Sequence, residues 1–252
     1  MMETQELNKL IDICHSNIKK TKIGKDYIFE ERGLSIDAFE KYKVGFFPRN
    51  TRKLSEYVSV DFMRSIGLMD YDGNSQFSDY YSIIFPIYDD YGVPVGIAGR
   101  CMLSDDERNI LSIPKYKNSK FKKANNLFGL NLAKKDILHK QNVYVVEGYF
   151  DQISMYDSGI TNVVAACGTG FSKTHFVKLA RYTDKISIFL DGDESGQKSA
   201  QLIYNKYINK GIKLRFVKLP NEYKDAGEYF LDNNKTALDF ATDIENILPV
   251  EF

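Results

Sequence analysis

Acidic residues stand at the ends of three apolar runs in the second half of the chain. Glu147 follows the run at 143–146, Asp191 and Asp193 follow the run at 186–190, and Asp225 comes after the run at 214–219. If these runs are neighbouring parallel strands, their carboxyl ends open on one crevice, where α/β proteins place their chemistry. Carboxylates crowded together repel one another and call for cations. Hard oxygen ligands without His or Cys suit Mg²⁺ or Mn²⁺ rather than Zn²⁺.

The segments between the acids predict the sheet that would bring these acids together. Short apolar runs alternate with helical stretches, in the order 143–146, 150–156, 163–166, 172–182, 186–190, 195–210 and 214–219. Continuous apolar strands separated by helices are typical of βαβ units that are buried on both faces. Gly159 and Gly211 stand where two of the helices should end, which suits left-handed helix caps. The pattern therefore predicts a doubly wound parallel sheet.

Motifs along the chain resemble, in the right order, those of one protein family. Four motifs resemble the TOPRIM domain in the version found in DnaG-type DNA primases of bacteria and phages: Glu147-Gly-Tyr-Phe-Asp151, Ala166-Cys-Gly-Thr-Gly, Asp191-Gly-Asp-Glu-Ser-Gly and Lys224-Asp-Ala-Gly-Glu228. The upstream motifs are similar to those of the primase polymerase core: Arg32-Gly-Leu-Ser, Val44-Gly-Phe, Phe85-Pro-Ile, Gly99-Arg100, Pro114-Lys-Tyr-Lys-Asn-Ser119, Phe121-Lys-Lys123 and Leu127-Phe-Gly-Leu130. The resemblance covers 27–230, and the ordered set is specific although each piece alone is weak.

The resemblance implies a catalytic core that synthesises short RNA primers on single-stranded DNA from nucleoside triphosphates. It implies two or more Mg²⁺ or Mn²⁺ ions, held by Glu147, Asp191, Asp193 and Asp225. Glu147 would act either as a ligand or as the group that transfers a proton. Arg100, Lys115 and Lys123 would stabilise negative charge on the transferred phosphoryl group. The residues expected to contact nucleotide or DNA are Arg100, Lys115, Tyr116, Lys117, Asn118, Lys122 and Lys123.

A basic segment precedes the acid-bearing region. It runs from Arg108 to Lys123, contains no acidic residue, and interleaves its cations with Tyr116 and Phe121. Such a segment is either a solvated loop or a surface that contacts phosphates, and the lack of compensating acids favours phosphate contact. Contacts of this kind position a nucleic acid and carry little sequence information.

Two other motifs are disfavoured by their spacing. The stretch from Asp191 could open a calcium loop, but the twelfth position is Leu202, where a bidentate Glu is required, and an expected strand precedes it. The stretch 168–174 superficially suggests a phosphate loop, but Ser172 stands where that loop needs Gly. A tight strand-to-helix turn accounts for the second motif better.

Composition limits the class of protein. The 252 residues, 43% of them hydrophobic, can bury a core as one large domain or two small ones. The sequence has no run of about eighteen apolar residues and no signal-like N-terminus, so we expect a cytoplasmic protein without membrane contact. Cys14, Cys101 and Cys167 lack zinc-ligand spacing, so no zinc is expected. The formal net charge of +0 argues against a protein that coats nucleic acid.

We expect three parts in the chain. Residues 1–140 form a mixed α/β primase-core subdomain with the basic segment, 141–220 form the TOPRIM metal-binding domain, and 221–252 form the last metal-ligand loop and a short helical tail. In the first part we expect helices at 6–18, 25–32 and 36–42 and strands at 82–88 and 93–102. In the tail we expect helices at 226–231 and 235–247.

Departures from the family leave alternatives open. Ser82 stands where an Arg is expected, and Gly227 stands where many relatives carry a second Asp, so one phosphate contact and one metal ligand are in doubt. Neither the zinc-ribbon module nor the helicase-binding domain of complete bacterial primases is found in this sequence, which suits a core fragment or a naturally minimal primase. A TOPRIM-type nuclease and an inactive primase-like subunit that binds nucleotide or single-stranded DNA are the alternative functions.

The partners implied by the resemblance are a single-stranded DNA template, nucleoside triphosphates and the RNA primer–DNA hybrid, in a bacterial cell or a phage-infected host. A replicative helicase or a separate zinc-ribbon or primosome protein would supply start-site specificity. The apolar stripe formed by Leu7, Leu10, Ile11 and Ile18 on the first helix is either core or a docking surface for that partner. Stripes at this spacing are more often core.

Overall fold

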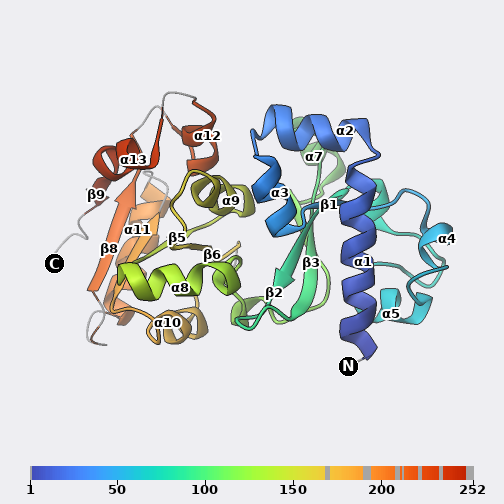
Figure 1. Ribbon diagram of the computed structural model, residues 1–252, viewed down its shortest axis with the longest axis horizontal. Coiled ribbons are helices and arrows are strands. Elements are labelled where there is room, and N and C mark those ends of the chain that lie inside the picture. The colour runs from blue at the N-terminus through green and yellow to red at the C-terminus, as the bar shows by residue number, and fades with distance from the viewer. Residues whose placement is uncertain are drawn as a thin grey trace. The chain divides into compact units, whose positions relative to one another are not determined.

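The chain divides into two compact units. The computed structural model describes residues 2–167, 171–189, 194–207, 211, 213–220, 223–232 and 235–247, with backbone alone for 194–200 and 245–247. Unit 1 is Met1–Lys122 and unit 2 is Lys123–Phe252 (Figure 1). The first part expected from the sequence ends later, at residue 140. The division falls earlier because Leu130, Ala133 and Ile137, on helix α8 (Leu130–Lys140), belong to the core of unit 2.

Unit 1 is built on an antiparallel sheet with helices before and between its strands. Its elements are α1 (Met2–Ile18), α2 (Lys22–Lys25), the π-helix η1 (Asp26–Glu31), α3 (Ile36–Tyr42), β1 (Gly45–Phe46), α4 (Thr51–Leu54), α5 (Val60–Ser65), α6 (Gln76–Asp79), β2 (Ile83–Tyr88), β3 (Pro94–Arg100), α7 (Asp105–Leu111) and β4 (Tyr116–Asn118). The strand order is β1-β2-β3-β4, with every pair antiparallel. The strands predicted at 82–88 and 93–102 are therefore confirmed as β2 and β3.

The apolar stripe of α1 belongs to the core of unit 1. Leu7, Leu10, Ile11 and Ile18 are all buried, and the first three share a cluster with Ile84 of β2 and Ile97 of β3. The alternative interpretation, that this stripe is a docking surface, is wrong because its side chains already face the protein interior. None of the helices that the structure describes is long and apolar enough to span a lipid bilayer.

The helix predicted near 25–32 takes an unusual form. The chain continues from α2 into the π-helix η1, where the N–H of Arg32 donates to the carbonyl of Tyr27 at 3.1 Å, five residues back. Such wide turns bring residues five apart onto one face of the helix and often mark functional positions. Gly33, with φ of 61°, then lets the chain leave the helix. The wide turn thus places Tyr27 and Arg32 side by side.

Unit 2 contains a five-stranded sheet. Its elements are the 3₁₀ turn η2 (Lys123–Asn125), α8, β5 (Val143–Val146), α9 (Tyr149–Asp157), β6 (Val163–Ala165), α10 (Lys173–Leu179), β7 (Lys185–Phe189), α11 (Glu194–Tyr207), β8 (Lys213–Lys218), α12 (Ala226–Leu231), α13 (Ala237–Asp243) and β9 (Glu245–Ile247). The strand order is β6-β5-β7-β8-β9, and the first four strands are parallel. The doubly wound parallel sheet is therefore confirmed. Gly159 and Gly211, with φ of 94° and 73°, adopt the predicted left-handed conformation.

The tail differs from the prediction after its first helix. The helix predicted at 226–231 is α12, but the second helix ends at Asp243 instead of continuing to Ile247. Ile244 is extended (ψ 128°), and β9 pairs antiparallel with β8, Val217 opposite Asn246. A three-residue edge strand has too short a hydrophobic pattern to be recognised in sequence. The tail thus closes the exposed edge of β8.

Candidate metal and phosphate sites

The strand order of unit 2 reverses at β5. The chain passes from β5 through α9 to β6 on one side, and then crosses to β7 on the other side of β5. Open α/β sheets bind ligands at such a switch point, outside the carboxyl ends of the strands. Glu147 follows the last residue of β5 and is exposed, and its carbonyl accepts a hydrogen bond from Cys167 N–H at 2.9 Å. Asp191 and Asp193, expected just after β7, lie outside the described residues.

Asp225 caps a helix next to a second carboxylate. Its Oδ1 accepts from the N–H of Glu228 at 2.8 Å, so Asp225 is the N-cap of α12. Asp151, on α9, accepts from the N–H of Gly148 at 3.0 Å and from the N–H of Gly227 at 3.3 Å. A Cβ built at Gly227 would lie 3.2 Å from Asp225 Oδ1 and 3.5 Å from Asp151 Oδ1. The first turn of α12 therefore brings these two carboxylates together.

These acids have the chemistry that a hard divalent cation requires. A carboxylate has two oxygens, so an Asp225 that caps a helix through Oδ1 can still bind a cation through Oδ2. Among the described residues, no group of three or more His, Cys, Asp or Glu side chains is close enough to hold a metal ion. Of the described acids, the structure thus brings Asp151 and Asp225 together, and the predicted site also includes the two aspartates expected after β7.

Lys123 belongs to the same unit as the acids. It begins η2, whose next residue, Ala124, accepts a hydrogen bond from the hydroxyl of Ser172 at 2.9 Å. Burial raises the pKa of the Cys167 thiol, and Tyr149 and the positive charge of Lys123 partly offset that rise. The N–H of Cys167 also donates to the carbonyl of Glu147, so the charge of Lys123 acts on a residue next to the end of β5. The sequence predicted a phosphate-stabilising role for this lysine, as the last residue of the basic segment.

The rest of the basic segment lies in unit 1, around the edge strand β4. Arg100 pairs in register with Tyr116, and Gly99 pairs with Lys117. Lys115 and Lys122 are exposed, whereas Asn118 is half-buried, and Lys117 donates to the side-chain carbonyl of Gln76. Arg108 differs from these residues because it lies on α7 and pairs with Asp105 at 2.5 Å. The predicted loop is therefore a helix followed by an edge strand that presents several cations.

Arg100 is buried between two tyrosines. Its Nε donates to the hydroxyl of Tyr27, its Nη1 donates to the hydroxyl of Tyr116 at 2.8 Å, and only 9% of the residue is exposed. Arg32 donates to the same Tyr27 hydroxyl, from Nη2 at 2.9 Å. Burial alone would lower the pKa of Arg100, but its contacts with the two tyrosines leave that pKa raised. Tyr27 therefore joins two guanidinium groups through one oxygen.

Sequence reasoning missed Asp151 and Tyr27 as site residues. Asp151 stands at the third position of α9, where an acid commonly bonds back to the helix start, and this spacing could have identified it. Tyr27 lies 73 residues from Arg100, and no local pattern indicates their contact. Ser82, where an Arg is expected, is buried, and its carbonyl accepts from Phe47 N–H at 2.8 Å.

Known proteins match both units of the chain. Residues 13–134 match the family described as DNA primase catalytic core, N-terminal domain, and residues 144–230 match the Toprim-like family. A DNA primase of Lactococcus lactis is 29% identical over 228 residues, which cover 88% of this chain and 35% of the relative. A DNA primase of Clostridium acetobutylicum is 31% identical over 249 residues, with 93% and 39% covered. The chain thus spans well under half the length of these two relatives.

Solved structures agree with the sequence comparisons. A crystal structure of Aquifex aeolicus primase, with its zinc-binding and RNA polymerase domains, has a TM-score of 0.83 and 26% identity, covering 97% of this chain and 61% of that one. A DnaG primase catalytic domain bound to single-stranded DNA has a TM-score of 0.76 and 26% identity, covering 96% and 79%. The order of the two matched families, the switch-point acids and these folds lead to one conclusion: the chain belongs to the DnaG-type primase family, as a catalytic core with a Toprim domain.

Proposed function

We propose that this chain synthesises short RNA primers on single-stranded DNA by metal-dependent nucleotidyl transfer. The observation that carries the proposal is the reversal of strand order at β5 with acids after the strands, in a chain that matches both halves of the primase core in order. In the reaction, a 3′ hydroxyl attacks the α-phosphorus of a nucleoside triphosphate. A new P–O bond forms, the bond to the bridging oxygen breaks, pyrophosphate leaves, and the hydroxyl proton passes to a base.

The acids of unit 2 would hold two or more Mg²⁺ or Mn²⁺ ions. The proposed ligands are Glu147, Asp191, Asp193 and Asp225, and the nearby carboxylate of Asp151 supports the first turn of α12 through the N–H of Gly227. When bound, divalent ions neutralise phosphate charge and lower the pKa of a coordinated hydroxyl. Glu147, exposed at the end of β5, would either bind such an ion or accept the proton of the attacking hydroxyl.

Cations of both units would bind and orient phosphates. Arg100, Lys115 and Lys123 would stabilise the charge that develops during transfer, a role that typically contributes about 10²–10³ in rate for each contact. Tyr116, Lys117 and Lys122 would position the nucleotide or the DNA backbone, and Asn118 would add a hydrogen bond. Such contacts give strong salt dependence and little sequence preference.

The proposed partners follow from the same chemistry. Single-stranded DNA, nucleoside triphosphates and the primer–template hybrid would bind to the core, in the cytoplasm of a bacterium or a phage-infected host. A helicase or a separate zinc-ribbon or primosome protein would direct the core to its start sites. Because the stripe of α1 is core, this partner would use another surface.

One assay tests the proposal against its alternatives. The protein is incubated with single-stranded DNA, labelled ribonucleotides and Mg²⁺ or Mn²⁺, and both the RNA and the DNA are separated by length. We expect short RNA that depends on template and metal, and none from an Asp191→Asn, Asp193→Asn variant prepared in parallel. Cut DNA without RNA would indicate the nuclease, and bound but unchanged DNA would indicate an inactive subunit; either result would refute the proposal.

A further inference from the structure

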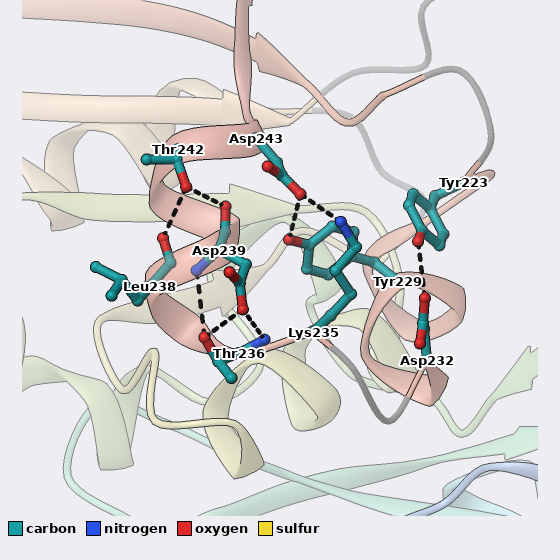
Figure 2. A network of polar contacts seen from close by, with 9 residues as sticks. All are labelled: Tyr223, Tyr229, Asp232, Lys235, Thr236, Leu238, Asp239, Thr242 and Asp243. Carbon is teal, nitrogen blue, oxygen red and sulfur yellow. Dashed lines mark hydrogen bonds and ion pairs between the residues drawn. The ribbon is translucent and has the colours of Figure 1, made fainter.

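Side chains at the C-terminal end of unit 2 form a connected polar network (Figure 2). We call it the tail network: Tyr223, Tyr229, Asp232, Lys235 and Asp243. Lys235 Nζ lies 2.6 Å from Asp243 Oδ2, and the hydroxyl of Tyr229 donates to the same oxygen at 2.9 Å. The hydroxyl of Tyr223 donates to Asp232 at 3.0 Å. The Lys235 ammonium also lies 5.6 Å and 5.2 Å from the ring centroids of Tyr223 and Tyr229.

The network is largely shielded from water. Tyr229 is fully buried, and the side chains of Lys235 and Asp243 are 22% and 28% exposed. The bond from Lys235 lowers the pKa of the Asp243 carboxyl, whereas burial raises the pKa of Tyr229. At neutral pH the carboxylate of Asp243 is therefore ionised while the phenol of Tyr229 remains a neutral donor. Charge–charge and cation–π contacts are stronger at such partly desolvated positions than in open solvent.

Both rings that Lys235 contacts flank Asp225. Tyr223 precedes Asp225 by two residues and Tyr229 follows it by four, and their ring centroids are 4.9 Å apart. The N–H of Tyr229 donates to the carbonyl of Asp225 at 3.1 Å. The aromatic rings at both ends of the segment 223–229 thus lie beside one ammonium group, and the metal-ligand candidate Asp225 lies between them in sequence.

We propose that Lys235 is a positioning residue for Asp225. The ammonium holds the two tyrosines at a fixed separation, and this separation sets the direction in which the Asp225 carboxylate meets a metal ion. The inference rests on the proposed function in one respect, namely that Asp225 binds a divalent cation. Groups that orient a metal ligand from behind typically change metal affinity by about 10–100-fold when they are removed.

Manganese binding by the full chain tests this inference without any polymerase assay. Mn²⁺ affinity is measured by electron paramagnetic resonance, well below the melting temperature, for wild type, Lys235→Met, Asp225→Asn and the double variant. We expect Lys235→Met to weaken binding about tenfold. In the Asp225→Asn background the same change should have no further effect, because a residue that acts through Asp225 is coupled to it. Lys235→Arg should restore most of the affinity, since a guanidinium also pairs with carboxylates and stacks on rings.

A matched substitution separates positioning from general damage to the fold. Lys213→Met removes an ion pair with Asp184 (3.5 Å) at the start of β8, the strand whose other end leads to Asp225, and should leave Mn²⁺ affinity unchanged. If Lys235→Met does not fold, Lys235→Gln replaces it, because an amide can still donate to Asp243 but lacks the charge that lies over both rings. Equal losses from both lysine variants, or additive losses with Asp225→Asn, would overturn the inference.

The failure of this inference can be told apart from the failure of the proposed function. RNA synthesis with unchanged Mn²⁺ affinity in Lys235→Met would overturn the positioning role alone. Weakened Mn²⁺ binding in that variant, coupled to Asp225 but without RNA synthesis by the wild type, would support the positioning role and refute the primase activity. A wild type that binds no Mn²⁺ would overturn both.

Discussion

The two units hold their charged groups in place by different means. In unit 2, the carboxylates of Asp151 and Asp225 accept hydrogen bonds from backbone N–H groups at the starts of α9 and α12. In unit 1, the guanidinium of Arg100 donates to the hydroxyls of Tyr27 and Tyr116. The acids are thus fixed by main chain, which every sequence of this fold supplies. The cation is fixed by side chains, which a single substitution can remove.

The difference has consequences for how each site responds to change. Asp225 keeps its Oδ1 on a backbone amide when a neighbouring side chain changes, so such a change acts on the direction of the carboxylate rather than on its cap. The acids also remain like charges that repel until a cation binds. A buried arginine held by phenols is already organised without a ligand, and its position depends on partners far away in sequence. We therefore expect unit 2 to respond to metal and unit 1 to respond to mutation of its tyrosines.

The largest expected effect tests the acid side of the comparison. Asp193→Ala should abolish nucleotide incorporation and leave the fold intact or more stable without metal, because it removes one of several like charges. Thermal melting with and without Mn²⁺ measures the change, since a ligand stabilises the state that binds it. Equal gains from Mn²⁺ in wild type and variant would show that the metal binds elsewhere.

A pair of substitutions in unit 1 contrasts a buried cation with an exposed one. Arg100→Ala and Lys115→Ala should each lower the rate of primer synthesis by about 10²–10³, the usual loss for one charge contact. Only Arg100→Ala should also destabilise the protein, by about 1–3 kcal/mol, because the half-buried Tyr116 loses its Arg100 donor and the buried Tyr27 loses one of its two arginine donors. Lys115 is exposed, so its removal should change the free energy of unfolding by less than about 0.5 kcal/mol.

Rate assays and urea unfolding of the same two preparations check this contrast. Normal primer synthesis by both variants would mean that the basic segment is a solvated surface that does not contact phosphates. A large stability loss in Lys115→Ala would mean that the difference in burial between Arg100 and Lys115 does not decide how much each contributes to the free energy of unfolding. Lys123→Ala, in unit 2, should match Lys115→Ala in rate.

A smaller effect is expected when a carboxylate is added beside Asp225. Gly227→Asp places a Cβ 3.2 Å from Asp225 Oδ1, so the new acid should lower stability without metal and increase the gain from Mn²⁺. Gly227→Asn has nearly the same size without the charge and serves as the control. Melting of both variants with and without Mn²⁺ gives the comparison. An equal response of the two variants would show that steric strain, rather than charge, governs this position.

The sequence pattern predicted unit 2, which carries the acids, better than unit 1, which carries Arg100 and most of the basic segment. Strands β5 to β8 are short apolar runs between helices, and burial on both faces of a parallel sheet leaves that pattern in the sequence. Helix α12 was predicted with its bounds, because Asp225 is a good N-cap and Leu231 ends the apolar period. The sites that follow strands are therefore readable from local patterns.

The parts that the sequence did not predict depend on distant or very short contacts. β4 and β9 are three-residue edge strands, whose pairing is decided by the neighbouring strand rather than by their own pattern. The wide turn at η1 and the meeting of Tyr27 with Arg100 depend on packing across 73 residues. No periodic pattern in the sequence indicates such a contact. The candidate role of Tyr27 as a partner of Arg100 could therefore be inferred only from the structure.

Removal of one hydroxyl group provides the finest test of the comparison. Tyr27→Phe keeps the ring, over which Arg32 and Arg100 lie at 5.1 Å and 5.8 Å, but removes the oxygen that accepts from both. Because Tyr116 still accepts from Arg100, we expect a fall in primer synthesis of less than about tenfold and a stability loss of about 1 kcal/mol, the usual net value of a hydrogen bond. The loss of activity should be seen mainly as a raised KM for nucleotide, since a loosely held guanidinium binds phosphate less well but stays charged.

Tyr71→Phe is the matched control, because Arg64 lies over its ring at 5.5 Å while Tyr71 is 89% exposed. This variant should change neither primer synthesis nor stability. If both variants behave like wild type, the hydroxyl of Tyr27 does not hold Arg100 in its working position, and ring stacking with Tyr116 would be enough to organise the cation side.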